Sequence, residues 1–190
     1  MIFLRKLNIF RRYGNLEFPD REFQIICDIF NKIIKYVKDD KNLEAQISIV
    51  ILSETYYKKD NEEKLYILEK IKHNQIFHEK DFWFDFINKS ILKEVQRNLK
   101  NDLRKTSDRE VENMKTKKFE KLAFAQTLPI IKTICEFGLE KKIIYEILES
   151  LVVYYQLSEE SKKMLFAMVN LNVSDNKELT NKNKTVIENK

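Results

Sequence analysis

The sequence predicts an all-α protein, organised as one irregular bundle of about six to eight helices around a central helix that contains Trp83. A chain of 190 residues can bury a hydrophobic core without disulfides or metal ions. It contains only two glycines and two prolines. Glycine and proline usually make up roughly 7% and 5% of a protein, so this chain has few residues from which Gly-rich loops and hairpin turns could form. Apolar residues recur mostly at helical spacing.

The central helix is predicted between His78 and Leu103. The run from Phe82 to Ile87 is too apolar on all sides for a surface helix, which indicates burial. We expect the centre of the core to contain Phe82, Trp83, Phe86, Ile87 and Ile91. Further along, helical spacing predicts an apolar stripe made of Leu92, Val95, Leu99 and Leu103. Beside it lies a basic stripe, defined as Lys93, Arg97, Lys100 and Arg104. The helix should therefore start in the core and emerge into water.

Several helices are expected before this central one. Residues 1–17 should form a short docking helix and a loop, and a second helix should start at Pro19-Asp20 and stop near Asp39. The stretch 43–58 is rich in β-branched residues and would also permit a strand, but no partner strand is evident, so we expect a helix. The spacing in Asp60-Asn61-Glu62-Glu63 is typical of a capping box, which predicts a helix through about Lys72.

After the central helix, the apolar sequence from Phe119 onward predicts a helix that either begins or kinks near Pro129. Gly138 is expected to end it, because glycine readily takes the positive φ of a helix C-terminus. Two more helices should cover residues 140–156 and start again at Ser158. We expect the helical domain to occupy residues 1–169, and residues 170–190 to be a disordered polar tail because they are poor in apolar side chains.

Charge and cysteine content bear on partners and compartment. The 35 Lys and Arg residues exceed the 30 Asp and Glu residues, which gives a net charge of +5 and weak evidence for an acidic partner. The segment Met1–Arg12 holds four basic residues and no acid, although such runs are usually solvated faces. Cys27 and Cys135 lie in apolar sequence, which suits buried thiols in a reducing compartment. Without a signal-peptide pattern or a transmembrane segment, we expect a cytoplasmic protein.

No motif predicts catalysis. His73 and His78 are the only histidines, and a structural zinc site would need more Cys or His ligands, so no metal and no cofactor are expected. Paired carboxylates such as Glu62-Glu63 fall at predicted helix starts, where the helix dipole explains them. Two tyrosine pairs, Tyr56-Tyr57 and Tyr154-Tyr155, lie at predicted helix ends. Half-buried packing is the simpler explanation of these pairs, and a partner-binding site is the alternative.

Five short motifs resemble, in order and spacing, the helical domain named after SET-binding factor. They are Thr55-Tyr56-Tyr57, Leu65-Tyr66-Ile67-Leu68, Asn74-Gln75-Ile76-Phe77, Phe82-Trp83 with Glu94, and Phe137-Gly138-Leu139, and Leu4-Arg5 fits the start of that family. The resemblance spans roughly Phe3 to Leu165. The chain departs from the family pattern at Phe77, where the family has tryptophan, and at Lys89, where it has aspartate. A contact made by that aspartate therefore does not carry over.

The resemblance implies a non-enzymatic interaction module, because this family domain accompanies DENN Rab-exchange domains in pseudophosphatases of the myotubularin family. We expect an adaptor or scaffold in membrane traffic or cytoskeletal assembly, or a subunit of a larger complex, with Rab-pathway or cytoskeletal proteins as partners. The candidate partner-binding residues are the basic stripe and the two tyrosine pairs. The alternative is a basic module for acidic surfaces, either anionic lipid through peripheral contact or, less favoured for want of a binding-module signature, nucleic acid.

Overall fold

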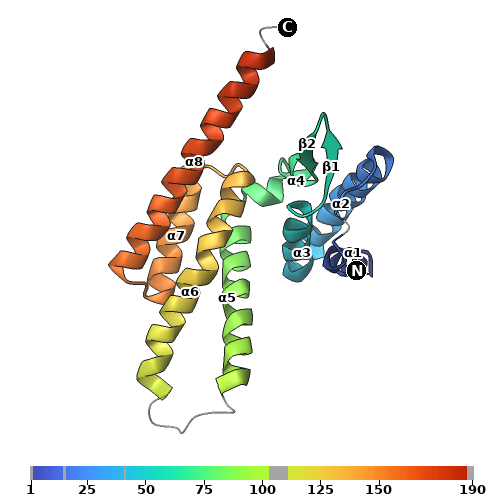
Figure 1. Cartoon of the computed structure of the whole chain (residues 1–190). Coiled ribbons are helices and arrows are strands. Elements are labelled where there is room, and N and C mark those ends of the chain that lie inside the picture. Colours follow the sequence, from blue (N-terminus) through green and yellow to red (C-terminus); the bar gives the residue numbers. More distant parts are fainter. Residues whose placement is uncertain (1, 15, 41, 103–110, 188–190) are drawn as a thin grey trace. The chain divides into compact units, whose positions relative to one another are not determined.

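The computed structural model describes residues 2–14, 16–40, 42–102 and 111–187, and its described side chains lie within 2–14, 16–36, 42–98 and 119–173. The all-α prediction is confirmed: this part of the chain forms eight α-helices, one 3-10 helix and a single two-stranded sheet (Figure 1). The contacts divide the chain into two compact units, Met1–His78 and Glu79–Lys190, where the sequence predicted one domain. We call them the first and the second unit and describe each by itself.

The first unit contains four α-helices and a hairpin. In chain order its elements are α1 (Ile2–Arg12), α2 (Asp20–Asp40), α3 (Leu43–Ser53), β1 (Tyr57–Asp60), β2 (Glu63–Tyr66), α4 (Leu68–Ile71) and the 3-10 helix η1 (Gln75–His78). Its core includes the apolar side of α2, where four residues at helical spacing are buried: Phe23, Cys27, Phe30 and Ile34. Helix α3 begins after Asn42, whose Oδ1 accepts a hydrogen bond from the backbone N–H of Ala45 at 3.1 Å. The β-branched stretch is therefore helical, as expected.

The hairpin corrects two sequence predictions. Helix α3 ends at Ser53 rather than near residue 58, and the predicted capping box is instead the turn of an antiparallel pair in which Tyr57 faces Tyr66. Both central turn residues lie in the left-handed region, Asn61 at φ 48° and Glu62 at φ 72°. Such a turn matches the twist of two-stranded ribbons and usually contains glycine, which is absent here. The turn was therefore not recognisable from its composition.

The second unit is built from four long helices: α5 (Lys80–Asp102), α6 (Val111–Glu136), α7 (Lys141–Tyr155) and α8 (Glu159–Ile187). Figure 1 shows α5 and α6 lying side by side in opposite directions, with α7 and α8 completing the bundle, and contacts join α6 to α8 and α7 to both α5 and α8. Helix α6 is continuous through Pro129, so that residue does not start a new helix.

The predicted core around Trp83 is confirmed. Its side chain has no exposed surface, and its ring centroid lies 4.8 Å from that of Phe82, 5.6 Å from that of Phe86 and 5.3 Å from that of Phe137. Ile87 and Ile91 are also fully buried. Edge-on ring packing of this kind stabilises a core beyond the burial of apolar area alone.

The apolar stripe predicted farther along α5 is wrong at its first position. Ile91 is fully buried, whereas the neighbouring Leu92 is 49% exposed, so the buried face lies one residue earlier than expected. Val95 is half-buried. The side chain of Leu99, and Leu103 as a whole, lie outside the described residues.

Helices α6 and α7 both end at left-handed residues. Gly138 has φ 77°, its N–H donates to the carbonyl of Cys135, and the N–H of Leu139 donates to the carbonyl of Ile134, which is the Schellman arrangement. The prediction for Gly138 is thus confirmed. Gln156 ends α7 in the same conformation, at φ 50°, without being a glycine.

Helix α8 continues to Ile187, so the boundary predicted at residue 169 falls inside a helix. Residues 170–187 are helical in this structure, and the disorder expected from residue 170 stays a prediction. A helix can continue through this segment because it contains neither glycine nor proline, Lys is a good helix former, and Asn disfavours a helix only modestly. Residues 188–190 lie outside the described part.

Candidate interaction surfaces

The cysteines are poorly suited to nucleophilic chemistry. Cys27 and Cys135 are 1% and 5% exposed, so both thiols are buried, as the sequence predicted. Burial raises the pKa of each thiol to about 11, which suppresses the reactive thiolate at neutral pH.

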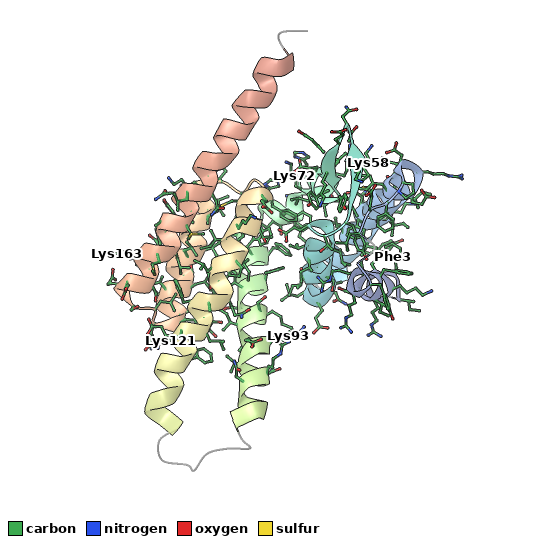
Figure 2. The ribbon with its side chains drawn as sticks, viewed as in Figure 1. Phe3, Lys58, Lys72, Lys93, Lys121 and Lys163 are labelled. Carbon is green, nitrogen blue, oxygen red and sulfur yellow. The ribbon has the colours of Figure 1, made fainter. Side chains whose placement is uncertain are left out.

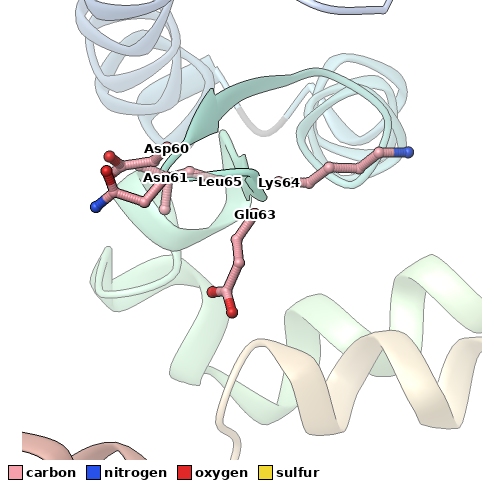
Figure 3. A pocket seen from close by; sticks show the side chains of 5 residues that line it. All are labelled: Asp60, Asn61, Glu63, Lys64 and Leu65. Atoms are coloured by element: carbon pink, nitrogen blue, oxygen red, sulfur yellow. The ribbon is translucent and has the colours of Figure 1, made fainter.

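The histidines do not form a metal site. His73 and His78 are both exposed, and within the described residues no group of three or more His, Cys, Asp or Glu side chains could hold a metal ion. A shallow, open hollow lies at the turn between β1 and β2, lined by Asp60, Asn61, Glu63, Lys64 and Leu65. Figure 3 shows Asp60 and Asn61 on one side, with Glu63 and Lys64 pointing in two other directions, so the polar groups do not converge as in a ligand site.

The first tyrosine pair is mostly structural. Tyr56 is fully buried, its hydroxyl donates a hydrogen bond to the carbonyl of Leu7 at 2.5 Å, and burial raises its pKa. Tyr56 therefore attaches α1 to the rest of the first unit, and it is removed from the candidate partner-binding residues. Tyr57 is half-buried in β1, with the Nζ atom of Lys64 lying 4.6 Å from its ring centroid.

The second tyrosine pair divides in the same way. Tyr155 is 7% exposed, its hydroxyl donates to Oδ1 of Asn88 at 2.6 Å, and burial raises its pKa to about 12. It links α7 to α5 and is also removed from the candidate binding residues. Tyr154 is 68% exposed and stays a candidate.

Tyr154 belongs to an exposed apolar cluster, which we call the α7 corner and define as Phe84, Val153 and Tyr154. Val153 is 79% exposed, and Phe84 is half-buried with its ring edge-on to Tyr154 at a centroid distance of 6.3 Å. The sequence did not single out Val153 or Phe84, because their helices are apolar over much of their circumference and periodicity cannot identify the outward side.

The basic stripe is only partly described. Lys93 and Arg97 are exposed on α5, and Lys93 is labelled in Figure 2. Arg97 forms an ion pair with Glu94 at 2.9 Å, so part of its charge is neutralised within the helix. The side chain of Lys100, and Arg104 as a whole, lie outside the described residues, so the stripe stays a prediction.

Helix α1 presents a second exposed surface. Leu4 and Leu7 are buried, as expected for a docking helix. The remainder of the segment is unusual for a solvated face because it carries large apolar side chains, with exposures of 73% for Ile2, 52% for Ile9, 52% for Phe10 and 80% for Tyr13. The basic residues Arg5, Lys6, Arg11 and Arg12 are exposed as well.

Comparisons with models of known protein families, with curated proteins and with solved structures found no match to this chain. The resemblance to the SET-binding factor domain therefore stays a prediction. In the part of the chain that the structure describes, every helix is too short or too polar to cross a bilayer.

Proposed function

We propose that this protein is a non-enzymatic helical adaptor that binds a protein partner through the α7 corner. The observation that carries the proposal is the exposure of Val153 and Tyr154, at 79% and 68%, at the end of a helix whose neighbouring residues Leu151 and Tyr155 are buried. Large apolar side chains grouped at an exposed site are typical of interaction surfaces.

The α7 corner has the physical properties of a binding hot spot. The ring of Tyr154 is held edge-on between Phe84 and Tyr155, with centroid distances of 6.3 Å and 4.9 Å. Little conformational entropy would therefore be lost when a partner covers it. Tyrosine is among the residues that contribute most to binding energy, and covering Val153 would add about 1 kcal/mol of hydrophobic stabilisation.

The charges beside the corner indicate the chemistry of the partner. Glu149 precedes Val153 by four residues and Glu146 precedes it by seven, so both lie on the same side of α7. Glu149 is exposed, and Glu146 is half-buried with its carboxylate 3.6 Å from the Nζ atom of Lys80. A complementary segment would offer an aliphatic side chain flanked by Lys or Arg.

For the cellular setting we propose membrane traffic or cytoskeletal assembly, on the basis of the family resemblance. The resemblance of Thr55-Tyr56-Tyr57, Phe82-Trp83 and Phe137-Gly138-Leu139 to the SET-binding factor domain favours membrane traffic or cytoskeletal assembly, with Rab-pathway or cytoskeletal proteins as partners. Two buried thiols suit a reducing compartment such as the cytoplasm.

The test is affinity purification of the tagged full chain from its own cells, with quantitative mass spectrometry. The corner variant combines Val153→Asp with Tyr154→Ala, and the matched control is Tyr36→Ala, which removes a 75% exposed tyrosine from α2. Circular dichroism should first show that both variants keep their helical content.

We expect a stoichiometric partner that the wild type and the Tyr36→Ala control retain and that the corner variant loses. Glu149→Lys should weaken the same partner, because it reverses the charge proposed to attract it. A partner set that is unchanged in the corner variant, or no stoichiometric partner at all, would overturn the proposal.

A further inference from the structure

We propose that the exposed side of α1 is a docking surface for anionic lipid membranes. This surface, the α1 face, is defined as Ile2, Arg5, Lys6, Ile9, Phe10, Arg12 and Tyr13. It belongs to the first unit, whereas the α7 corner belongs to the second, so the inference is independent of the proposed function.

Helix α1 has two different sides. Leu4 and Leu7, 3% and 5% exposed, pack into the first unit, and the hydroxyl of Tyr56 bonds to the carbonyl of Leu7. The edge of Phe3 also packs against Phe30 of α2, with ring centroids 6.4 Å apart. The helix is therefore held from one side, and its opposite side is directed to the surroundings.

The outer side of α1 carries apolar side chains between basic ones. Ile2 and Ile9 are seven residues apart and thus lie about 20° from each other around the helix axis. Lys6 lies on one side of this apolar line and Arg5 on the other. A row of aliphatic side chains between cations suits the boundary between lipid headgroups and acyl chains, where the cations meet phosphates and the apolar groups leave water.

Helix α1 is positively charged. The helix contains Arg5, Lys6, Arg11 and Arg12 and no acidic residue, so it contributes four of the net positive charges in a chain whose total is +5. An anionic partner is thereby favoured over a neutral or cationic one. Nucleic acid would use the cations equally well, but exposed isoleucines gain nothing from a phosphate backbone, which favours lipid.

Tyr13 and Phe10 extend the surface past the end of the helix. Tyr13 is 80% exposed in the turn that follows α1, and Phe10 is 52% exposed. Aromatic side chains are enriched at the level of lipid headgroups, where one end of the ring is apolar and the other is hydrated. Their position beside the cations is what a membrane-contacting segment requires.

The test is sedimentation of the full chain with phosphatidylcholine vesicles that contain or lack about 30% phosphatidylserine. We expect binding only to the anionic vesicles, and this binding should weaken as salt rises because salt screens the electrostatic attraction. Replacing Arg5 and Lys6 by Gln should lower the partition coefficient by roughly 25-fold, at about fivefold for each cation removed. The matched control replaces the exposed Lys142 and Lys163 by Gln and should bind as the wild type does.

Insertion of the apolar residues is tested separately. Since Cys27 and Cys135 are buried, an Ile9→Cys variant can be labelled selectively with an environment-sensitive fluorophore. Its emission should shift to the blue on adding anionic vesicles, while the same label at Val153→Cys should not respond.

Two results would overturn the proposal. One is absence of binding to anionic vesicles at low salt, or binding that the Arg5 and Lys6 substitutions leave unchanged. The other is binding to duplex RNA as strong as to vesicles at equal phosphate with no change in the Ile9→Cys emission, which would identify a nucleic-acid surface instead. Loss of a protein partner in the Val153 variant bears only on the α7 corner, so the two proposals can fail separately.

Discussion

Truncating the tryptophan at the centre of the second unit should cause a large loss of stability. Trp83 is fully buried and its ring packs against those of Phe82, Phe86 and Phe137. The Trp83→Ala substitution removes the whole indole and leaves these three rings without their common neighbour. Because the surrounding helices can close over such a space only partly, a cavity should remain.

The magnitude follows from burial. A buried tryptophan covers on the order of 200 Å² of surface, and at about 25 cal/mol per Å² its truncation removes up to roughly 5 kcal/mol of stabilisation. Measured substitutions of large aromatic core residues by alanine cost about 3 to 5 kcal/mol. We therefore expect Trp83→Ala to lower the free energy of unfolding by about 4 kcal/mol, which is a large fraction of the stability of an ordinary domain.

The assay is urea unfolding followed by the helical circular dichroism signal, since the variant loses the only tryptophan. Leu92→Ala is the matched control, because Leu92 lies on the same helix and is 49% exposed. It should change the free energy of unfolding by no more than about 0.5 kcal/mol. A loss below about 1 kcal/mol for Trp83→Ala, or equal losses for the two variants, would refute the reasoning that places Trp83 at the centre of the core.

Three further predictions concern helix ends and titration. Both Gly138 and Gln156 have positive φ, so Gly138→Ala should lower the free energy of unfolding by about 1 kcal/mol and Gln156→Gly should raise it by about 0.5 kcal/mol. Urea unfolding measures both changes, and changes of opposite sign would contradict this. Cys27 and Cys135 should react with a thiol reagent at pH 8 only after unfolding, because burial raises their pKa to about 11, and rapid native labelling would count against it. The pKa of Glu120 is lowered by hydrogen bonds from Ser158, so its stabilising contribution is present above the ordinary carboxyl pKa and is lost as pH falls through the lowered value. The stability difference between wild type and Glu120→Gln should shrink at low pH, and a difference that grows there would contradict the assignment.

The sequence predicted the helical core well because periodicity and residue size decide burial together. Trp83, Phe86 and Ile91 are buried on one side of α5, and Gly138 ends α6 as expected for a residue without a Cβ atom. These features depend on residues that are close together in the sequence, so the spacing of apolar residues and the position of a glycine predict them.

The hairpin was not predicted because its turn depends on two residues that seldom take positive φ together. Asp60 and Glu63 have the spacing of a capping box, and helix and hairpin compete for the same four residues. The hairpin is favoured where Tyr57 can pair with Tyr66, and where the carbonyl of Tyr57 accepts a hydrogen bond from the N–H of Phe18 at 2.9 Å. That last contact joins residues far apart in sequence, which no local pattern reports.

The candidate surfaces were predicted only in part for a similar reason. The sequence pattern identified both tyrosine pairs but did not show which tyrosines are buried. The hydroxyls of Tyr56 and Tyr155 form hydrogen bonds inside the protein, whereas Tyr154 is exposed. The bonds to Leu7 and Asn88 span dozens of residues along the chain. The exposure of Val153 likewise depends on how the neighbouring helices pack against α7, which the local sequence does not show.

Site-specific photo-crosslinking would show whether a protein partner binds at the α7 corner. A photoreactive phenylalanine analogue is introduced in place of Tyr154 in one sample and in place of Tyr36, 75% exposed on α2, in the control. We expect a discrete cross-linked protein from position 154 that is absent from position 36 and is lost when Glu149→Lys is added. No cross-link from position 154, or the same products from both positions, would contradict it.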